Sequence, residues 1–169
     1  MPQVIIQPAS ASNTHYADTI ENPVPLSRVR PFLSDEDYRS LIGLYDGGHV
    51  WVWGAKPSGR SRWTRIQSGD IFLFYGNKRF TRSASVTMTC HNRNLAADLW
   101  CPDQDGETWE YVFFLNNLRD VEIAVEDFNL LVGYEPNYFY PGFNILDQRR
   151  SDLALDAYEL NSDDRRLQD

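Results

Sequence analysis

The feature that most constrains the fold of this chain is a pair of adjacent β-rich runs at residues 70–77 and 79–92. The first reads DIFLFYGN and the second RFTRSASVTMTCHN, and both are rich in aromatic or β-branched residues. Such runs are typical of strands, and a short turn at Gly76-Asn77-Lys78 favours antiparallel pairing. The sequence therefore predicts a β-hairpin here.

Three other segments have the pattern of β-strands. They are residues 3–9 (QVIIQPA), 49–55 (HVWVWGA) and 109–125 (WEYVFFLNNLRDVEIAV), the last with an expected break at Asn116-Asn117. Within 49–55 the two valines share one face of the strand and the two tryptophans, Trp51 and Trp53, share the other. We therefore expect five or six strands in all.

Short helices are expected between and after these strands. Ser34 has the character of an N-cap, since three acids follow it, and Gly47-Gly48 is the expected end of that helix. Three further helices are expected over 14–20 with Asn13 or Thr14 as cap, over 94–100 (NLAADLW), and over 125–134 (VEDFNLLVGY).

This order of elements favours an α+β fold. The first two strands lie far apart in the sequence, with helices between them, and the later strands follow as a meander. A small, curved, partly closed mixed β-barrel of five to six strands, with short helices packed around it, satisfies that order. We expect one domain over residues 1–145 and a charged tail or linker over residues 146–169, which read LDQRRSDLALDAYELNSDDRRLQD.

Composition excludes several classes of protein. A hydrophobic content of 42% is typical of a folded globule, and no apolar run approaches the roughly 18 residues of a membrane span. Cys90 and Cys101 have neither a zinc spacing nor the pattern of a disulfide framework, and the three histidines stand alone. We expect a cytoplasmic protein with reduced cysteines, no membrane partner, no metal site and no cofactor.

Positive charge is concentrated in the middle of an acidic chain. The net charge is -8, yet the stretch from Lys56 to Arg93 holds eight cations and one acid, Asp70. One interpretation is an ordinary solvated face, and the other is a surface that binds phosphates. The candidate phosphate-binding residues are Lys56, Arg60, Arg62, Arg65, Lys78, Arg79 and Arg82.

Aromatic side chains stand next to this charge. Trp53 is followed by Gly54-Ala55 at the expected strand exit, where rigid scaffolds present binding groups. Trp100 and Tyr75 end their own elements and are candidates for an opposing wall. Two such walls can hold a nucleobase by stacking, although the same rings can also be core residues.

These residues resemble the EVE and YTH branch of the PUA-like superfamily. The resemblance rests on VWGA and SRWTRIQSGDIFLFYGNKRFTRSASV, followed by LAADLW and WEYVFFL, and it covers roughly residues 3 to 134. Members with this pattern include the N-terminal domains of McrB-type and HNH-type modification-dependent restriction proteins. The resemblance implies a PUA-like barrel that flips a modified base into an aromatic cage.

Carried over to this chain, the resemblance implies a set of base-binding residues. The cage would be formed by Trp53 and Trp100, with Tyr75 and Trp51 as further candidates. Polar contacts to the base edge would come from Ser12 or Asn13 after the first strand, or from Asn77. The cations would hold the phosphates around the flipped nucleotide.

The leading hypothesis is a non-catalytic module that reads methylated adenine or cytosine in DNA, with a linked or separate nuclease or NTPase domain as partner. One alternative is a reader of N6-methyladenine in RNA. A second is an amidohydrolase of the ASCH type, for which Lys56, Thr64 and Glu110 are available. A third is a protein-interaction domain whose aromatic residues all belong to the core.

Overall fold

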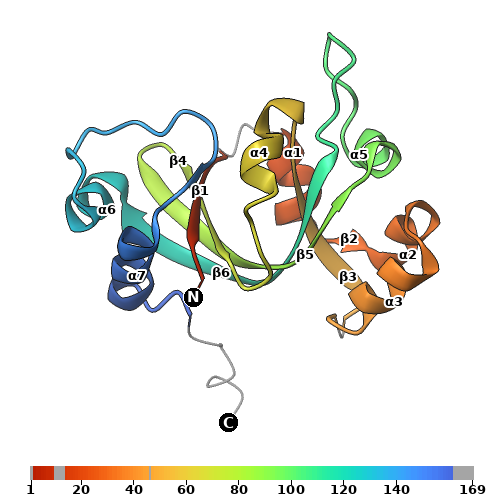
Figure 1. The fold of residues 1–169 in the computed structure, drawn as a ribbon, viewed down its shortest axis with the longest axis horizontal. Coiled ribbons are helices and arrows are strands. Elements are labelled where there is room, and N and C mark those ends of the chain that lie inside the picture. Colours follow the sequence, from red (N-terminus) through yellow and green to blue (C-terminus); the bar gives the residue numbers. More distant parts are fainter. Residues whose placement is uncertain (1, 10–13, 46, 162–169) are drawn as a thin grey trace. The chain divides into compact units, whose positions relative to one another are not determined.

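The computed structural model describes residues 2–9, 14–45 and 47–161, which divide into two compact units (Figure 1). The terminal unit comprises residues 2–9, 69–85 and 117–161. The middle unit comprises the remaining described residues, up to 68 and from 86 to 116. Each unit has a hydrophobic core of its own.

The described residues form seven strands of one mixed sheet. The strands are β1 (Val4–Pro8), β2 (Val24–Pro25), β3 (His49–Ala55), β4 (Ile71–Gly76), β5 (Arg79–His91), β6 (Tyr111–Ala124) and β7 (Asn144–Ile145). They are hydrogen-bonded in the order β2-β3-β6-β5-β4-β1-β7, in which β1 is parallel to β4 and antiparallel to β7. The order has two ends, so the sheet is not closed.

The expected α+β fold is confirmed, with more strands than predicted. The two extra strands, β2 and β7, have two residues each and are too short to show a period. The helices of the described residues are α1 (Thr14–Tyr16), α2 (Leu26–Val29), α3 (Asp35–Ile42), α4 (Arg60–Trp63), α5 (Arg93–Leu99), α6 (Val125–Val132) and α7 (Gln148–Ala157). Single π- or 3₁₀-helical turns lie at Ala17–Glu21, Arg30–Phe32 and Pro57–Gly59.

The hairpin predicted from the sequence is present in the terminal unit. β4 and β5 pair antiparallel, with Gly76 opposite Arg79. The two residues between them, Asn77 and Lys78, have positive φ angles of 53° and 62°. A two-residue turn with this backbone matches the twist of the paired strands, which is why it is favoured in hairpins.

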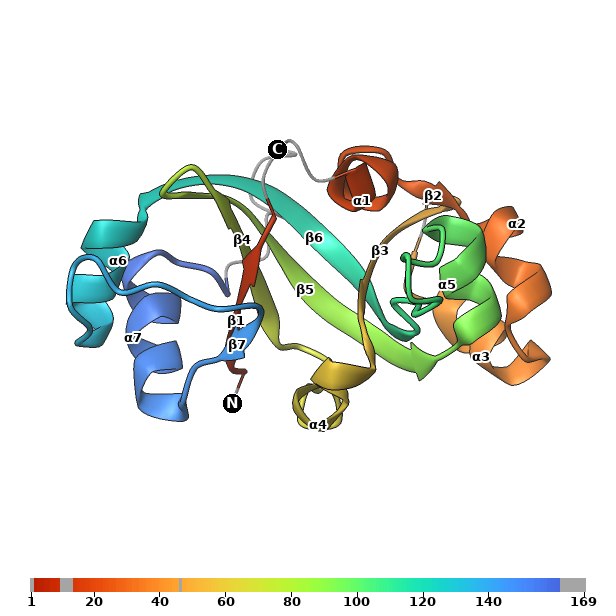
Figure 2. The same cartoon turned by 90° about the horizontal axis from the view of Figure 1, so that it is seen from above.

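The end of the described chain packs into the terminal unit. Residues 146–161 were expected to begin a tail or linker, but Leu146, Ala154, Leu155 and Leu160 are buried core residues. α7 lies beside α6 in both views (Figures 1 and 2). The part of the expected tail that the structure describes, residues 146–161, is thus packed against the core of the terminal unit, and the domain boundary stays a prediction.

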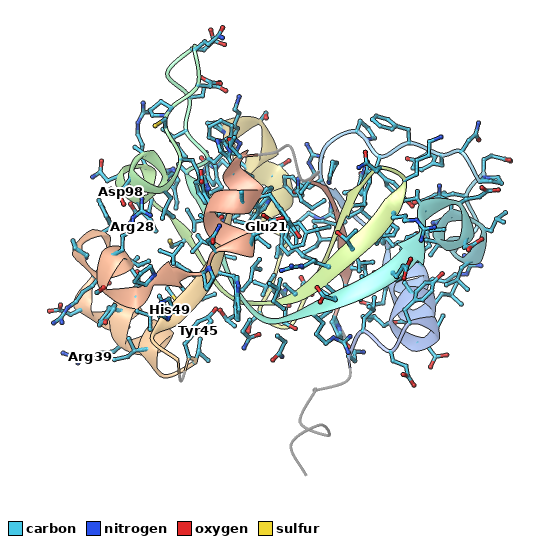
Figure 3. All side chains as sticks on the ribbon, turned by 180° about the vertical axis from the view of Figure 1, so that it is seen from behind. Glu21, Arg28, Arg39, Tyr45, His49 and Asp98 are labelled. Atoms are coloured by element: carbon cyan, nitrogen blue, oxygen red, sulfur yellow. The ribbon has the colours of Figure 1, made fainter. Side chains whose placement is uncertain are left out.

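The middle unit has helices where the sequence predicts them, with shifted ends. Ser34 caps α3 by accepting a hydrogen bond from the Asp37 N–H at 3.1 Å, as expected. The helix ends at Ile42, ahead of the expected glycines. α2 and α5 are joined by Arg28 and Asp98, which point toward each other in Figure 3 with Nε and Oδ2 2.9 Å apart.

β6 is continuous where a break was expected. The strand includes Asn116 and Asn117, and Asn117 adopts a positive φ of 50°. Asparagine tolerates this backbone better than most residues, so the irregularity is absorbed within the strand. In the middle unit β6 pairs with β3, and Tyr45 donates to the carbonyl of Leu115 at 2.7 Å.

Candidate functional site

The end of β3 carries the first residue of the candidate site, in the middle unit. Trp53 pairs with Phe113 across the β3–β6 ladder and is 5% exposed. Its ring meets Tyr16 edge-on, with 6.3 Å between centroids. β3 then leads through the 3₁₀ turn Pro57–Gly59 into α4 (Figure 2).

Gly54 lies against two further tryptophans. A Cβ atom at this position would lie less than 3.0 Å from the Trp109 carbonyl oxygen and 2.9 Å from Cζ3 of Trp100. The space beside Gly54 is therefore filled by protein side chain and backbone. A glycine is required here because only hydrogen fits between the strand and the tryptophans.

Trp100 directly follows α5 and is 2% exposed. Its backbone N–H caps the helix through the Ala96 carbonyl. Among the described residues its indole N–H is buried and has no hydrogen-bond partner. An unsatisfied buried donor costs about 1–3 kcal/mol, so this group is a candidate to donate to a ligand.

His15 lies against the same two rings. Its imidazole meets Trp109 edge-on at 4.1 Å between centroids and lies 6.1 Å from Trp100. Burial lowers the pKa of His15, Asp18 opposes this effect, and the charge of Lys56 adds to it. We call His15, Tyr16, Trp53, Trp100 and Trp109 the tryptophan cluster.

A cation lies over the exposed edge of the tryptophan cluster. Lys56 Nζ is 4.9 Å from the centroid of the half-buried Trp109 ring and 2.5 Å from Oδ2 of Asp103. Hydrogen bonding to this carboxylate raises the pKa of Lys56, and the same bond lowers the pKa of Asp103. The cluster thus joins aromatic surface to one paired positive charge.

A second aromatic group lies at the start of β6. Tyr111 stacks on His91 with 4.5 Å between centroids and meets Trp63 edge-on at 5.2 Å. His91 Nε2 lies 3.0 Å from Oε1 of Glu110, and Thr108 donates to Oε2 at 2.6 Å. The bonds from Thr108 and then His91 lower the pKa of Glu110. Both carboxylate oxygens of Glu110 thus have a partner, and Glu110 orients His91, on which Tyr111 stacks.

The other predicted base-binding residues do not join the tryptophan cluster. Trp51 is half-buried and makes no ring contact with the described residues. Tyr75 and Asn77 belong to the terminal unit, where Tyr75 donates to the carbonyl of Tyr140 at 3.0 Å. Ser12 and Asn13 lie outside the described residues. The site assignments of these residues stay predictions.

The predicted phosphate-binding cations are divided between the units. Lys56, Arg60, Arg62 and Arg65 are in the middle unit, and Lys78, Arg79 and Arg82 are in the terminal unit. Along β5, Arg79 pairs with Glu122 at 2.9 Å and Arg82 with Asp120 at 3.1 Å. Exposed pairs of this kind are worth about 0–1 kcal/mol, so a phosphate can compete for these cations.

Each of the residues available for amidohydrolase chemistry bonds to a different partner in the middle unit. Lys56 pairs with Asp103, and the Thr64 hydroxyl donates to the Ser61 carbonyl at 2.8 Å. Glu110 is engaged by Thr108 and His91, as described above.

Within the described ranges no three histidine, cysteine or acidic residues form a group that could hold a metal ion. None of the described helices is both long and apolar enough to cross a membrane.

Comparison with solved structures identifies the fold. The N-terminal domain of McrB from Thermococcus gammatolerans, solved bound to m5C DNA, matches with a TM-score of 0.66 and 15% identity. The match covers 93% of this chain and 97% of that domain. This chain has the fold of an McrB N-terminal domain. The resemblance predicted from the sequence is thus confirmed at the level of the fold.

Other comparisons add little. A protein from Agrobacterium tumefaciens aligns over 95% of this chain and 93% of its own, with a TM-score of 0.44 and 10% identity. No protein-family model and no curated protein matches the sequence.

Sequence reasoning missed several members of the site. Trp109 lies just before β6, and its alternation with Tyr111 in WEY was the available signal. His15 and His91 were interpreted as isolated histidines because their partners are distant in sequence. Trp63 donates to the carbonyl of Val112 at 3.2 Å, a contact that no local pattern predicts.

Proposed function

We propose that the middle unit binds a modified base in DNA, with modified cytosine as the first candidate. The observation that carries this proposal is the shared fold, over 93% of the chain, with a domain that was solved bound to m5C DNA. The tryptophan cluster supports it, since planar rings stack on a base face for about 1–3 kcal/mol each.

In this proposal the base is flipped out of the duplex into a cage that includes Trp53 and Trp100. The unpartnered indole N–H of Trp100 would donate to an acceptor on the base edge. Ser12 and Asn13 remain candidates for the other polar contacts, and N6-methyladenine remains a second possible base. Flipping costs a few kcal/mol of lost stacking, and the aromatic walls offset that cost.

The cations of the middle unit would hold the phosphates next to the flipped nucleotide. Arg60 and Arg65 are exposed and have no ion pair within the described part of the chain. Phosphate contacts position a protein on the duplex without reading its sequence. Affinity for unmodified DNA should therefore depend on these cations, and preference for the modified base on the tryptophans.

We further propose that the chain works in the cytoplasm together with a nuclease or NTPase domain, linked or separate, as in modification-dependent restriction. A reader without chemistry of its own needs such a partner to act on the DNA that it selects. Co-purification with a nuclease or NTPase encoded beside it would support this part of the proposal.

The test is a binding panel of otherwise identical oligonucleotides. Each carries one 5-methylcytosine, hydroxymethylcytosine, N6-methyladenine or no modification, as duplex DNA, single-stranded DNA or RNA. The expected result is tighter binding to one modified duplex. A 2-aminopurine placed next to the modified base in the same strand should brighten on binding if the modified base leaves the stack. Equal affinity for every oligonucleotide would refute the proposal.

Conservative variants test the cage, because both rings are nearly buried. Trp53→Phe and Trp100→Phe keep most of the packing, and Trp100→Phe removes the indole donor. We expect each to lose preference for the modified base while the melting temperature stays close to that of the parent. Tyr38→Phe, at a half-buried ring of α3 outside the tryptophan cluster, is the matched control and should keep the preference.

A further inference from the structure

The terminal unit contains a cavity of about 770 Å³ that has no place in the proposal above. Its walls come from the β4–β5 hairpin, the start of α6 and the segment that follows α6, and they include Asn77, Lys78, Arg79, Glu126, Tyr138 and Phe139. We call it the hairpin groove. Its size lies within the range of small-ligand sites, about 300–1,000 Å³.

One wall of the hairpin groove is tied to α6 through the backbone. The N–H of Val125, the first residue of α6, donates to the Lys78 carbonyl at 3.0 Å. The same hairpin is joined to the segment after α6, because the Tyr75 hydroxyl donates to the Tyr140 carbonyl. The turn that carries Lys78 is therefore held in place on both sides.

The opposite wall is held by one buried amide. Asn129 is fully buried on α6, and its Nδ2 donates to the carbonyls of Pro136 and Tyr138, each at 3.1 Å. Its Oδ1 accepts from the Tyr140 hydroxyl at 2.6 Å. The segment thus keeps a fixed path, so the groove is formed before any ligand arrives and little ordering entropy is lost on binding.

This fixed segment presents aromatic surface to solvent. Phe139 is 74% exposed and Tyr138 is 41% exposed. Tyr138 is itself stacked on Tyr134 with 4.4 Å between centroids. The guanidinium of Arg150 lies over the Tyr134 ring, 4.6 Å from its centroid. Phe139 and Tyr138 thus present adjoining aromatic surface that a ligand in the groove can contact.

Positive charge lies at the hairpin edge of the groove. Lys78 is exposed at the tip of the turn and has no ion pair within the described ranges. Among the described residues Arg79 is paired only with Glu122, and both side chains are largely exposed, at 56% and 82%. Glu126 is the one acid among the described residues that line the groove. The groove therefore offers aromatic faces next to two cations, Lys78 and the weakly paired Arg79.

We propose that the hairpin groove binds an unpaired nucleotide of a nucleic-acid strand. The base stacks against Phe139 and Tyr138, and the phosphate is held by Lys78 and Arg79. A nucleotide satisfies aromatic faces and cations at the same time, and the amide of Asn77 can bond to the base edge. The proposal does not rest on the reading of a modified base, since stacking accepts every base.

The test uses the full chain and unmodified, fluorescently labelled oligothymidine as the probe. Phe139→Ala should weaken binding roughly 5- to 150-fold, the equivalent of one lost stack. Lys78→Ala should weaken it less and reduce the slope of log affinity against log salt by about 0.7. Leu130→Ala, 57% exposed on α6, and Arg149→Ala, exposed on α7, are the matched controls and should change neither quantity.

Three outcomes would overturn this proposal. The first is unchanged affinity of Phe139→Ala, and the second is an unchanged salt slope of Lys78→Ala. The third is displacement of the probe by an acidic peptide that binds more tightly, which would assign the groove to a protein partner. Phe139→Leu, which keeps an apolar side chain without a planar face, guards against an effect on folding. Trp100→Phe should leave oligothymidine affinity intact, so failure of one proposal is separable from failure of the other.

Discussion

Replacing Gly54 by alanine is the sharpest test of how the tryptophan cluster is built. The new Cβ would lie within 3.0 Å of the Trp109 carbonyl oxygen, 2.9 Å from Trp100 Cζ3 and 3.0 Å from Trp109 Cβ. In real proteins a Cβ atom essentially never lies closer than 3.0 Å to such a non-bonded heavy atom. Two of the three clashing atoms belong to the backbone and Cβ of Trp109, which cannot rotate away.

The magnitude follows from this geometry. Overpacking of a well-packed site costs about 1–3 kcal/mol, and the backbone clash puts Gly54→Ala at the upper end of that range. For a chain of this size each kcal/mol shifts the melting temperature by about 2–4 °C, so we expect a loss of roughly 6–12 °C. Because both tryptophans must move, any folded fraction should also lose its preference for the modified base.

Gly47→Ala is the matched control in the same unit. A Cβ atom there meets nothing within 4 Å and the backbone φ is not positive, so the change should be neutral or stabilise by up to about 1 kcal/mol. Thermal unfolding followed by far-UV circular dichroism, together with tryptophan emission, measures both variants. If Gly54→Ala has the same melting temperature as the parent protein, Trp109 does not pack against β3 and the description of the cluster is wrong.

Three further predictions concern single groups. Burial raises the pKa of Cys90 to about 12, so a maleimide at neutral pH should label the exposed Cys101 and leave Cys90 unmodified in the folded protein, as read by mass spectrometry. Burial lowers the pKa of His15 below 6.5, so His15 binds a proton more tightly in the unfolded chain than in the folded protein. The free energy of unfolding should therefore fall as the pH drops below about 6.5. His15→Gln should flatten that fall, as measured by urea titrations at several pH values. Glu122→Gln frees Arg79 and should increase affinity for unmodified DNA at low salt, whereas Glu135→Gln, which has no ion pair to a described residue, should raise it less.

Much of the fold could be predicted because the signals for its elements are local. The alternation in β3, the short turn of the β4–β5 hairpin and the cap at Ser34 each depend on a few consecutive residues. α7 gave no such signal because its buried positions include a serine. Ser151 is fully buried, accepts from the Val4 N–H and donates to the Leu146 carbonyl, so a charged sequence still docks into the core.

The candidate site was harder to predict than the fold. Trp53 and Trp100 stand at element ends, which made them visible as a pair. Their neighbours His15 and Trp109 meet them only in the folded middle unit, and no spacing in the sequence encodes that contact. The cations were recognised as a set, but the acids that pair with them lie in the loop before β6 and in its second half, outside the basic stretch.

These pairs explain how an acidic chain can use a basic stretch. Lys56, Arg79 and Arg82 each have a carboxylate partner, and those three carboxylates have exposed fractions from 20% to 89%. The exposed acids opposite Arg79 and Arg82 hold these two cations weakly, and all three acids cancel positive charge at long range. Under the proposed functions, adhesion to bulk DNA, which is mostly electrostatic, is therefore reduced, while a phosphate brought close by stacking on the aromatic residues can displace an exposed acid. Under the proposed functions, the acids leave discrimination between bases to the aromatic residues and keep the cations available for a strand that is already in place.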